Sequence, residues 1–279
     1  MFSQLGFLVQ DAPNPGSRCH TALPLKGQES PLRGIADFTF AFVLLCVTLP
    51  LLLLAALLIK VSSRGHIIYR QTRLGRNGRP YMLYKLRTMV NNSEKNGACW
   101  SLPGDPRITL VGRFLRRSHL DELPQLWNVL MGDMSLIGPR PERPEFVPKL
   151  EQNIPHYRAR LLVRPGLTGL AQIQLPADTD LHSVRQKLAY DLWYLQKRNL
   201  GLDFRILVAT GLKMFGFRFA TLRWLLRFPL QEEVEKAYLT LPTDAGLRTH
   251  TEPVSLTQSE VDPNSAGSFL IPALVSEAE

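Results

Sequence analysis

Cysteine is scarce in this 279-residue chain: the three that occur, Cys19, Cys46 and Cys99, are far apart. The odd count and the lack of a CxxC pair argue against a disulfide framework and against a zinc site, and they fit a reducing compartment. His/Cys clusters at zinc spacing are also missing, so any metal site would depend on carboxylates. No internal repeat is visible, which argues against a repeat architecture.

Charge is missing from one long stretch, between Phe38 and Ile59. An apolar run of roughly 18 residues or more indicates insertion into a membrane. A long polar stretch precedes this run and no small-residue cleavage site follows it, so it does not resemble a signal peptide. We therefore predict a membrane helix over residues 33–60.

Proline interrupts this run at Pro50, where it removes a backbone hydrogen bond and bends the helix. Both flanks are basic, with Lys26 and Arg33 before the run and Lys60 after it. The positive-inside rule therefore places both flanks in the cytoplasm, which favours a re-entrant helix broken at Pro50 over a span. Asp37 at the entrance is expected to pair with a cation such as Arg33, because an unpaired acid there is costly.

The two ends of the chain are polar and rich in turn-forming residues. Residues 1–32 are predicted to form a flexible N-terminal tail, and residues 230–279 a disordered C-terminal tail. Residues 203–229 are apolar and aromatic with interspersed arginines and no acid after Asp203, a pattern typical of amphipathic interfacial helices.

Between the tails, β-branched and aromatic runs flank Asn77-Gly78, which predicts a small β-hairpin with that pair in its turn. Helical patterns dominate the remainder. The predicted fold class is α+β and mainly helical, with the re-entrant membrane helix followed by a cytoplasmic catalytic domain over residues 61–229.

Two adjacent carboxylates, Asp121 and Glu122, occur in "SHLDELPQLWNV". On a helix starting at Arg113 both would lie on the polar half, and Pro124 would force the helix to bend or restart beside them. Adjacent acids are by themselves also typical of a solvated helix face.

Three segments that combine arginine with glycine or proline, or with lysine, accompany this pair: "YKLRTM" (84–89), "GPRPERP" (138–144) and "RPGLTG" (164–169). Glycine allows close backbone approach to phosphate, and arginine offers a planar fork to its oxygens. The net charge of +9 also favours an anionic partner. A carboxylate pair beside phosphate groups suits Mg²⁺, with one carboxylate holding the ion while its neighbour attacks phosphorus. Phosphate chemistry on a lipid-borne substrate is therefore predicted.

Longer stretches, "IIYRQTRLGRNGRPYMLYKLRTM", "SHLDELPQLWNVLMGDMSLIGPRPE" and "RPGLTGLAQ", resemble the bacterial sugar transferase family of monotopic phosphoglycosyl transferases. The resemblance covers about residues 33–216. It implies transfer of a sugar 1-phosphate from a UDP-sugar to undecaprenyl phosphate, with release of UMP, at the cytoplasmic face of the bacterial inner membrane. Such a step begins the membrane stage of exopolysaccharide, capsule, O-antigen or glycoprotein glycan synthesis.

The resemblance also implies roles for individual residues. Asp121 would be the nucleophile that forms an aspartyl-phosphosugar intermediate, and Glu122 would bind Mg²⁺. Arg116, Arg117 and Arg140 are expected to keep Asp121 ionised. The residues expected to bind substrate or phosphate groups are Lys85, Arg87, Arg116, Arg140 and Arg164. The family's Ser-Pro membrane break is "TLP" here, which retains Pro50.

Two other functions stay open from the sequence. One is a non-catalytic, basic, membrane-docked module that binds anionic lipid or nucleic acid. The other is a DxD-type glycosyltransferase built around Asp178 and Asp180, which would release UDP instead of UMP. For the transferase the expected partners are a UDP-sugar, undecaprenyl phosphate and inner-membrane lipid; nucleic acid is not expected, and a homodimer stays open.

The membrane topology gives a first testable prediction. In a variant with its native cysteines replaced by serine, Lys26→Cys and Lys60→Cys should both resist a membrane-impermeant thiol reagent in intact cells and react after lysis, because both basic flanks face the cytoplasm. Labelling of one flank from the periplasm would contradict the re-entrant arrangement.

Overall fold

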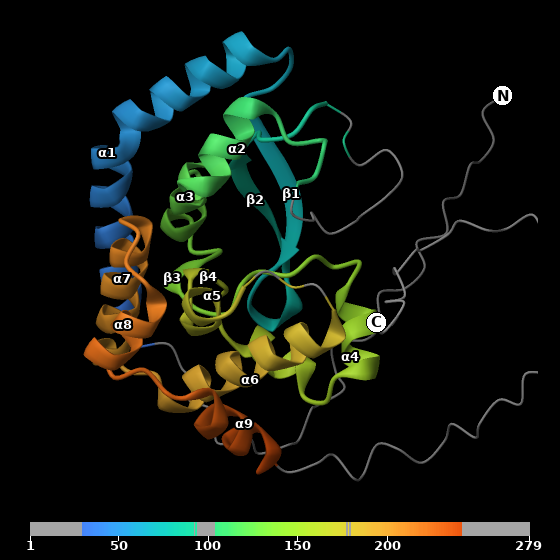
Figure 1. Ribbon diagram of the computed structural model, residues 1–279, viewed down its shortest axis with the longest axis vertical. Helices are drawn as coiled ribbons and strands as arrows, with labels where there is room; N and C mark the ends of the chain where they lie inside the picture. Colours follow the sequence, from blue (N-terminus) through green and yellow to red (C-terminus); the bar gives the residue numbers. More distant parts are fainter. Residues whose placement is uncertain (1–29, 92, 94–103, 177, 179, 242–279) are drawn as a thin grey trace, which may run out of the picture. The chain divides into compact units, whose positions relative to one another are not determined.

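The computed structural model describes residues 30–91, 93, 104–176, 178 and 180–241 (Figure 1). These residues are mainly helical and carry two small sheets, which confirms the predicted class in its broad form. The helices and 3₁₀ turns are α1 (Pro31–Ser62), η1 (Arg76–Gly78), α2 (Leu110–Arg117), η2 (Leu120–Glu122), α3 (Gln125–Leu130), α4 (Val147–Asn153), η3 (Tyr157–Leu162), α5 (Leu170–Gln174), α6 (Leu181–Lys197), α7 (Leu200–Met214), α8 (Phe219–Leu225) and α9 (Gln231–Leu239). The strands are β1 (Ile68–Leu74), β2 (Pro80–Leu86), β3 (Ser135–Ile137) and β4 (Gly166–Thr168).

Helix α1 is long and apolar enough to cross a membrane, with a mean hydropathy of 3.0 in a window of which only 11% is buried. Pro50 lies inside it, and Figure 1 shows that α1 changes direction along its length, one arm running beside α7 and the other above α2. The helix is slightly longer at both ends than the predicted 33–60. Such an exposed apolar surface on a helix supports association with a membrane.

The first turns of α1 are fastened to the rest of the protein by ion pairs. Asp37 is buried, accepts a hydrogen bond from the Ser135 hydroxyl (2.7 Å) and pairs with Arg164 at 3.6 Å. Arg33 instead pairs with Asp203 of α7 at 2.8 Å. The prediction that Asp37 pairs with a cation is confirmed, but the partner is Arg164, because Arg33 is already engaged with α7.

The predicted hairpin is confirmed. Strands β1 and β2 pair antiparallel from Ile68↔Leu86 to Leu74↔Pro80, and Asn77 (φ 57°) and Gly78 (φ 73°) take the left-handed conformations of a tight turn. Asn128 of α3 is fully buried and binds this hairpin through its side chain, donating to the Met82 carbonyl (2.7 Å). The hairpin and α3 therefore form one unit.

A second sheet was not predicted. Strands β3 and β4 are short and pair in parallel, with Ser135 opposite Gly166. A Cβ atom on Gly166 would lie 2.0 Å from the backbone nitrogen of Gly138. The glycines of "GPRPERP" and "RPGLTG" thus allow two backbone segments to pack against each other, a use of glycine that differs from the predicted approach to phosphate.

The helix predicted to start at Arg113 is broken in two. Helix α2 ends at Arg117, and His119 takes a left-handed conformation (φ 56°) before the short turn η2. Helix α3 begins directly after Pro124. The predicted break beside the acids is confirmed, but a continuous helical wheel is wrong because the chain turns at His119 as well.

The C-terminal helices cover the core. Helix α9 packs on α6 and has Val234 fully buried, while the Tyr238 hydroxyl donates to the Pro155 carbonyl at 3.0 Å. The prediction of disorder from residue 230 onward is therefore wrong for α9, whose apolar positions Val234 and Tyr238 follow a helical spacing within a polar segment. Residues 242–279 and 1–29 lie outside the described residues.

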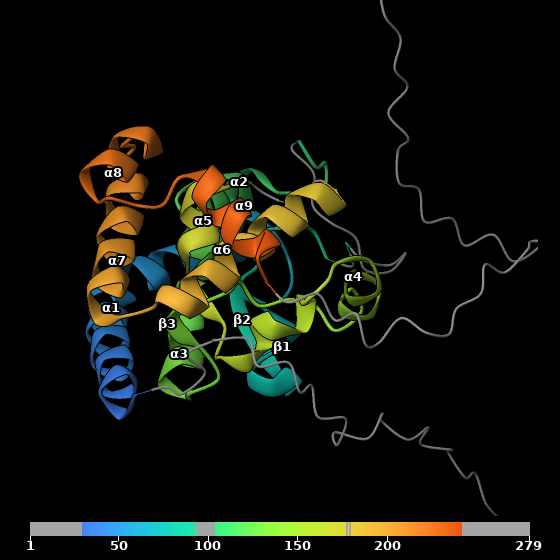
Figure 2. The same cartoon turned by 90° about the horizontal axis from the view of Figure 1, so that it is seen from below.

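Helices α7 and α8 lie beside α1 in Figure 1, and Figure 2 shows the same three helices along one side. Both carry large exposed apolar side chains, including Phe204 of α7, Phe215 after it, and Trp224 of α8, of which Trp224 is 82% exposed. Arginines accompany them in the sequence. This composition supports the predicted amphipathic character of the segment.

Candidate active site

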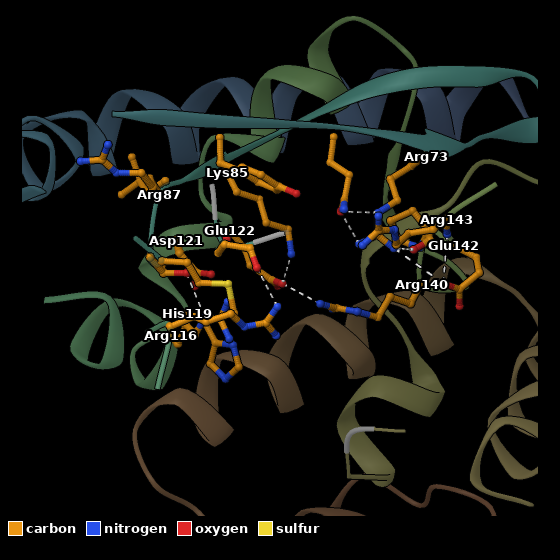
Figure 3. A pocket seen from close by; sticks show the side chains of 18 of the residues that line it. Arg73, Lys85, Arg87, Arg116, His119, Asp121, Glu122, Arg140, Glu142 and Arg143 are labelled. Carbon is orange, nitrogen blue, oxygen red and sulfur yellow. Dashed lines mark hydrogen bonds and ion pairs between the residues drawn. The ribbon is translucent and has the colours of Figure 1, made fainter. Parts of the chain in front are cut away.

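A cavity of about 730 Å³ opens between the hairpin, the turn η2 and the "GPRPERP" loop. The structure brings together six of the seven predicted polar site residues along its walls, and only Arg164 lies elsewhere (Figure 3). The residues so gathered are Lys85, Arg87, Arg116, Asp121, Glu122 and Arg140. They come from three sequence segments, and the hairpin, α2 with η2, and the loop after β3 position them.

Glu122 is held by two cations. Its Oε1 atom accepts from Lys85 Nζ at 2.9 Å and from Arg140 Nη2 at 2.8 Å, and Figure 3 shows both contacts meeting on this carboxylate. Burial alone would raise the pKa of Glu122, but Arg140 and Lys85 hold it well below its usual range. Glu122 is therefore a carboxylate whose charge is fixed.

Asp121 lies beside this cluster but none of the described ion pairs goes to it. Its side chain is buried, and burial together with the charge of Glu122 raises its pKa to about 6, against the opposing effect of Lys85, Arg116 and His119. Arg116 lowers the pKa of Asp121, in the expected direction, whereas Arg140 pairs with Glu122. With a pKa of about 6, Asp121 is still mostly ionised at neutral pH. Arg117, also expected to help, is exposed on α2 and does not line the cavity.

Arg116 reaches the cavity from the last turn of α2, where its Nε donates to the Thr88 hydroxyl at 2.9 Å. Arg87 lines the same cavity, but its guanidinium points away from Glu122 in Figure 3 and toward the end of α1. It donates to the backbone carbonyls of Ser63 and Arg64, each at 2.9 Å. Arg87 is thus placed near the dyad, with its terminal nitrogens engaged by the backbone.

Arg164 and the acids of the "DTD" motif make contacts other than the predicted ones. Arg164 does not line the cavity and pairs with Asp37 of α1, which corrects its predicted placement at a phosphate. In the "DTD" motif, Asp178 lines the cavity and pairs with Lys187 at 2.8 Å, whereas Asp180 caps α6 by accepting from the Ser183 backbone nitrogen at 2.7 Å. A helix cap does not supply the second acid of a DxD site.

The wall opposite the dyad carries charged residues that the sequence reading missed. Arg73 Nη1 donates to the Pro141 carbonyl at 3.0 Å and lies 3.7 Å from Glu142, and Arg143 and Phe146 line the same region. Arg143 lies in the "GPRPERP" segment, three residues after Arg140, so its place at the cavity could have been predicted from the sequence. Arg73 had no such signal, because only the hairpin register brings it to this wall.

The carboxylates fit a hard divalent ion. No group of three or more His, Cys, Asp or Glu side chains gathers within the part of the chain that the structure describes, so an all-protein cage is not formed there. Mg²⁺ is commonly bound by one or two carboxylates together with substrate phosphates. Lys85 and Arg140 both contact Glu122 through its Oε1 atom. Glu122 and the neighbouring Asp121 match that donor set.

Two adjacent carboxylates in unequal environments are an arrangement found in active sites. The cations of the cavity favour an anionic ligand. Comparison with known proteins makes the class specific. The chain belongs to the bacterial sugar transferase family, whose family model matches residues 28–216.

Relatives with functional names include a UDP-N-acetylgalactosamine-undecaprenyl-phosphate N-acetylgalactosaminephosphotransferase of Aeromonas hydrophila, 42% identical over 65% of this chain and 44% of its own length. A UDP-glucose:undecaprenyl-phosphate glucose-1-phosphate transferase of Caulobacter vibrioides is 45% identical over 63% of this chain and 67% of its own length. The exopolysaccharide production protein PSS of Rhizobium leguminosarum is 41% identical over 60% of this chain and 86% of its own length. The chain thus spans less than half of the Aeromonas relative.

The raised pKa of Asp121 gives a prediction for the protein without substrate. In ¹³C-carboxyl NMR of aspartate-labelled protein, the resonance that vanishes in Asp121→Asn should titrate with a midpoint of about 6. Burial also raises the pKa of Asp191 to about 6, so a second resonance of this kind should remain in the variant. Because burial disfavours the charged form, the carboxylate that can attack is depleted below this pH and accumulates above it. A midpoint at the ordinary aspartate value of about 3.9 would contradict this environment.

Proposed function

We propose that this protein transfers a sugar 1-phosphate from a UDP-sugar to undecaprenyl phosphate and releases UMP. The observation that carries the proposal is the different environment of two adjacent carboxylates in one cavity, Glu122 held between cations and Asp121 outside those ion pairs. The names of the relatives, which describe transfer of glucose or N-acetylgalactosamine phosphates to undecaprenyl phosphate, support the substrate classes.

The reaction is written in two steps. An oxygen of the ionised Asp121 carboxylate attacks the phosphorus that bears the sugar, the bond from this phosphorus to the bridging oxygen breaks, and UMP leaves with that oxygen. A phosphate oxygen of undecaprenyl phosphate then attacks the same phosphorus, and the Asp121 oxygen leaves. The products are a sugar-diphosphate lipid and the free carboxylate. One site thereby serves a water-soluble donor and a lipid acceptor in turn.

The cations of the cavity stabilise this chemistry. Arg116 is close enough to Asp121 to lower the pKa of its carboxyl. The side chain of Arg140 is 48% exposed, so it can contact phosphate oxygens from the cavity side. Arg73 and Arg143 line the far wall and add positive charge for the donor diphosphate. Fixed cations in a partly buried site stabilise negative charge more than they would in water.

The proposal includes the membrane and the metal. The bent, exposed α1 enters and leaves the cytoplasmic leaflet of the bacterial inner membrane as a re-entrant helix, so that the cavity faces the cytoplasm near the lipid phosphate. Glu122 would hold Mg²⁺ while the neighbouring Asp121 attacks phosphorus, and the ion would neutralise charge on the diphosphate when bound. The lipid product places the reaction at the start of a membrane-borne glycan assembly; the sugar itself is set by no residue identified above.

The nucleophile is tested by exchange. Purified protein in lipid nanodiscs should exchange radiolabelled UMP into a UDP-sugar without acceptor lipid, and Asp121→Asn should lower this rate by at least about a thousandfold, because the amide cannot attack. Asp180→Asn is the matched control, since asparagine caps a helix as well as aspartate does. Exchange that survives in Asp121→Asn, or release of UDP in place of UMP, would contradict the proposal.

The metal role is tested separately. Activity should disappear with excess EDTA and return with Mg²⁺, and binding of the substitute ion Mn²⁺, followed by its electron paramagnetic resonance signal, should weaken in Glu122→Gln. Full activity in EDTA, or unchanged Mn²⁺ binding in Glu122→Gln, would argue against a metal on Glu122.

A further inference from the structure

The two cations that hold Glu122 lie on different elements, and side chains near them make hydrogen bonds to different ends of α1. We name residues 31–49 the N-terminal arm and residues 51–62 the C-terminal arm, on either side of Pro50. Lys85 belongs to β2, whereas Arg140 follows β3 by three residues.

The C-terminal arm is fastened by Arg87, two residues after Lys85. Arg87 Nη2 donates to the carbonyl (2.9 Å) and hydroxyl (2.7 Å) of Ser63, the residue that caps α1. Its Nη1 donates to the Arg64 carbonyl and to Asn91 Oδ1, both at 2.9 Å. The guanidinium of Arg87 thus binds backbone carbonyls directly after the C-terminal end of α1. In this position the side chain links the end of β2 to the end of that helix.

The backbone around this guanidinium is shaped to receive it. Gly65 has φ +123°, and a Cβ there would lie 2.2 Å from Arg87 Nη1. Below it, Ala55 and Ile59 of the C-terminal arm pack in a small core with Leu86 of β2 and Leu115 of α2. The arm, the end of β2 and the helix before the dyad therefore pack against one another in one small core.

The N-terminal arm is fastened to β3 by Asp37. Its carboxylate accepts from the Ser135 hydroxyl at 2.7 Å and from the Leu136 backbone nitrogen at 3.2 Å, and both donors belong to β3. The chain then runs from β3 into the loop that carries Arg140. A shift of this arm would therefore displace the base of that loop.

We propose that Arg87 and Asp37 are positioning residues that tie the two arms of α1 to Lys85 and Arg140, so that the bend of the membrane helix sets the geometry around Glu122. The inference deepens the proposed function and rests on it. It also gives Arg87 a role other than contact with a substrate phosphate, since its two terminal nitrogens are turned to the α1 exit.

The test is a double-mutant cycle on UMP exchange in nanodiscs. Arg87→Gln should lower the rate about 30-fold, because small displacements of a catalytic group are costly. In a Lys85→Arg background the same change should cost less than about threefold, since its effect passes through Lys85. Asp37→Asn should behave likewise toward Arg140→Lys, and thermal unfolding of each variant checks that it is folded.

Gly65→Ala supplies a variant outside the cavity. It should reproduce the loss seen in Arg87→Gln, because the new Cβ would lie 2.2 Å from Arg87 Nη1 and 2.6 Å from Asn91 Oδ1, which accepts from Arg87. The matched controls are Gly78→Ala, another positive-φ glycine with open space around it, and Arg79→Gln on the exposed hairpin turn; both should keep the full rate.

Full additivity of Arg87→Gln with Lys85→Arg, in folded protein, would overturn the proposal. A rise in the KM for the UDP-sugar with unchanged kcat in Arg87→Gln would overturn it too, and would point to a phosphate ligand. Absence of exchange in the unmodified protein is a different outcome, which would refute the proposed function itself.

Discussion

The ion pairs of Glu122 with Lys85 and Arg140 are the interaction on which the site depends. Two carboxylates next to each other in a buried cavity repel, and without compensation both would be driven toward protonation. Placing both cations on one of them separates their behaviour: Glu122 stays ionised, while the pKa of Asp121 rises to about 6. Unequal environments of this kind allow two like residues to take different roles.

The fold is arranged around that contact. Lys85 comes from a hairpin that Asn128 fastens to α3, the dyad lies on a turn between two broken helices, and Arg140 follows a short strand of a second sheet. The membrane helix touches both of the cation-bearing units. In the proposed function, this arrangement would build the site directly on the helix that meets the lipid, where a phosphate anchored in a bilayer can be reached.

Local features were predictable from the sequence and long-range pairings were not. The apolar run, the Asn77-Gly78 turn and the break beside Pro124 are encoded within a few residues, and each appears in the structure. Six of the seven predicted polar site residues line one cavity. They could be predicted because they lie in motifs of recognisable composition.

What failed depended on partners distant in the chain. Arg164 was placed at a phosphate, yet it pairs with Asp37, more than a hundred residues earlier. The rise in the pKa of Asp121 was not predicted, because composition shows how many cations are near in sequence but not which carboxylate they contact. Helix α9 was missed since its few apolar positions are meaningful only against α6.

The central claim is that Asp121, and not the charge-fixed Glu122, becomes covalently bonded to the sugar phosphate. Peptide mapping by mass spectrometry, after rapid acid quenching of the protein with a UDP-sugar and no acceptor lipid, tests it most directly. The account predicts a sugar-phosphate adduct on Asp121 of the "SHLDE" segment, which undecaprenyl phosphate removes. An adduct on Glu122, or UMP release with every carboxylate unmodified, would contradict it.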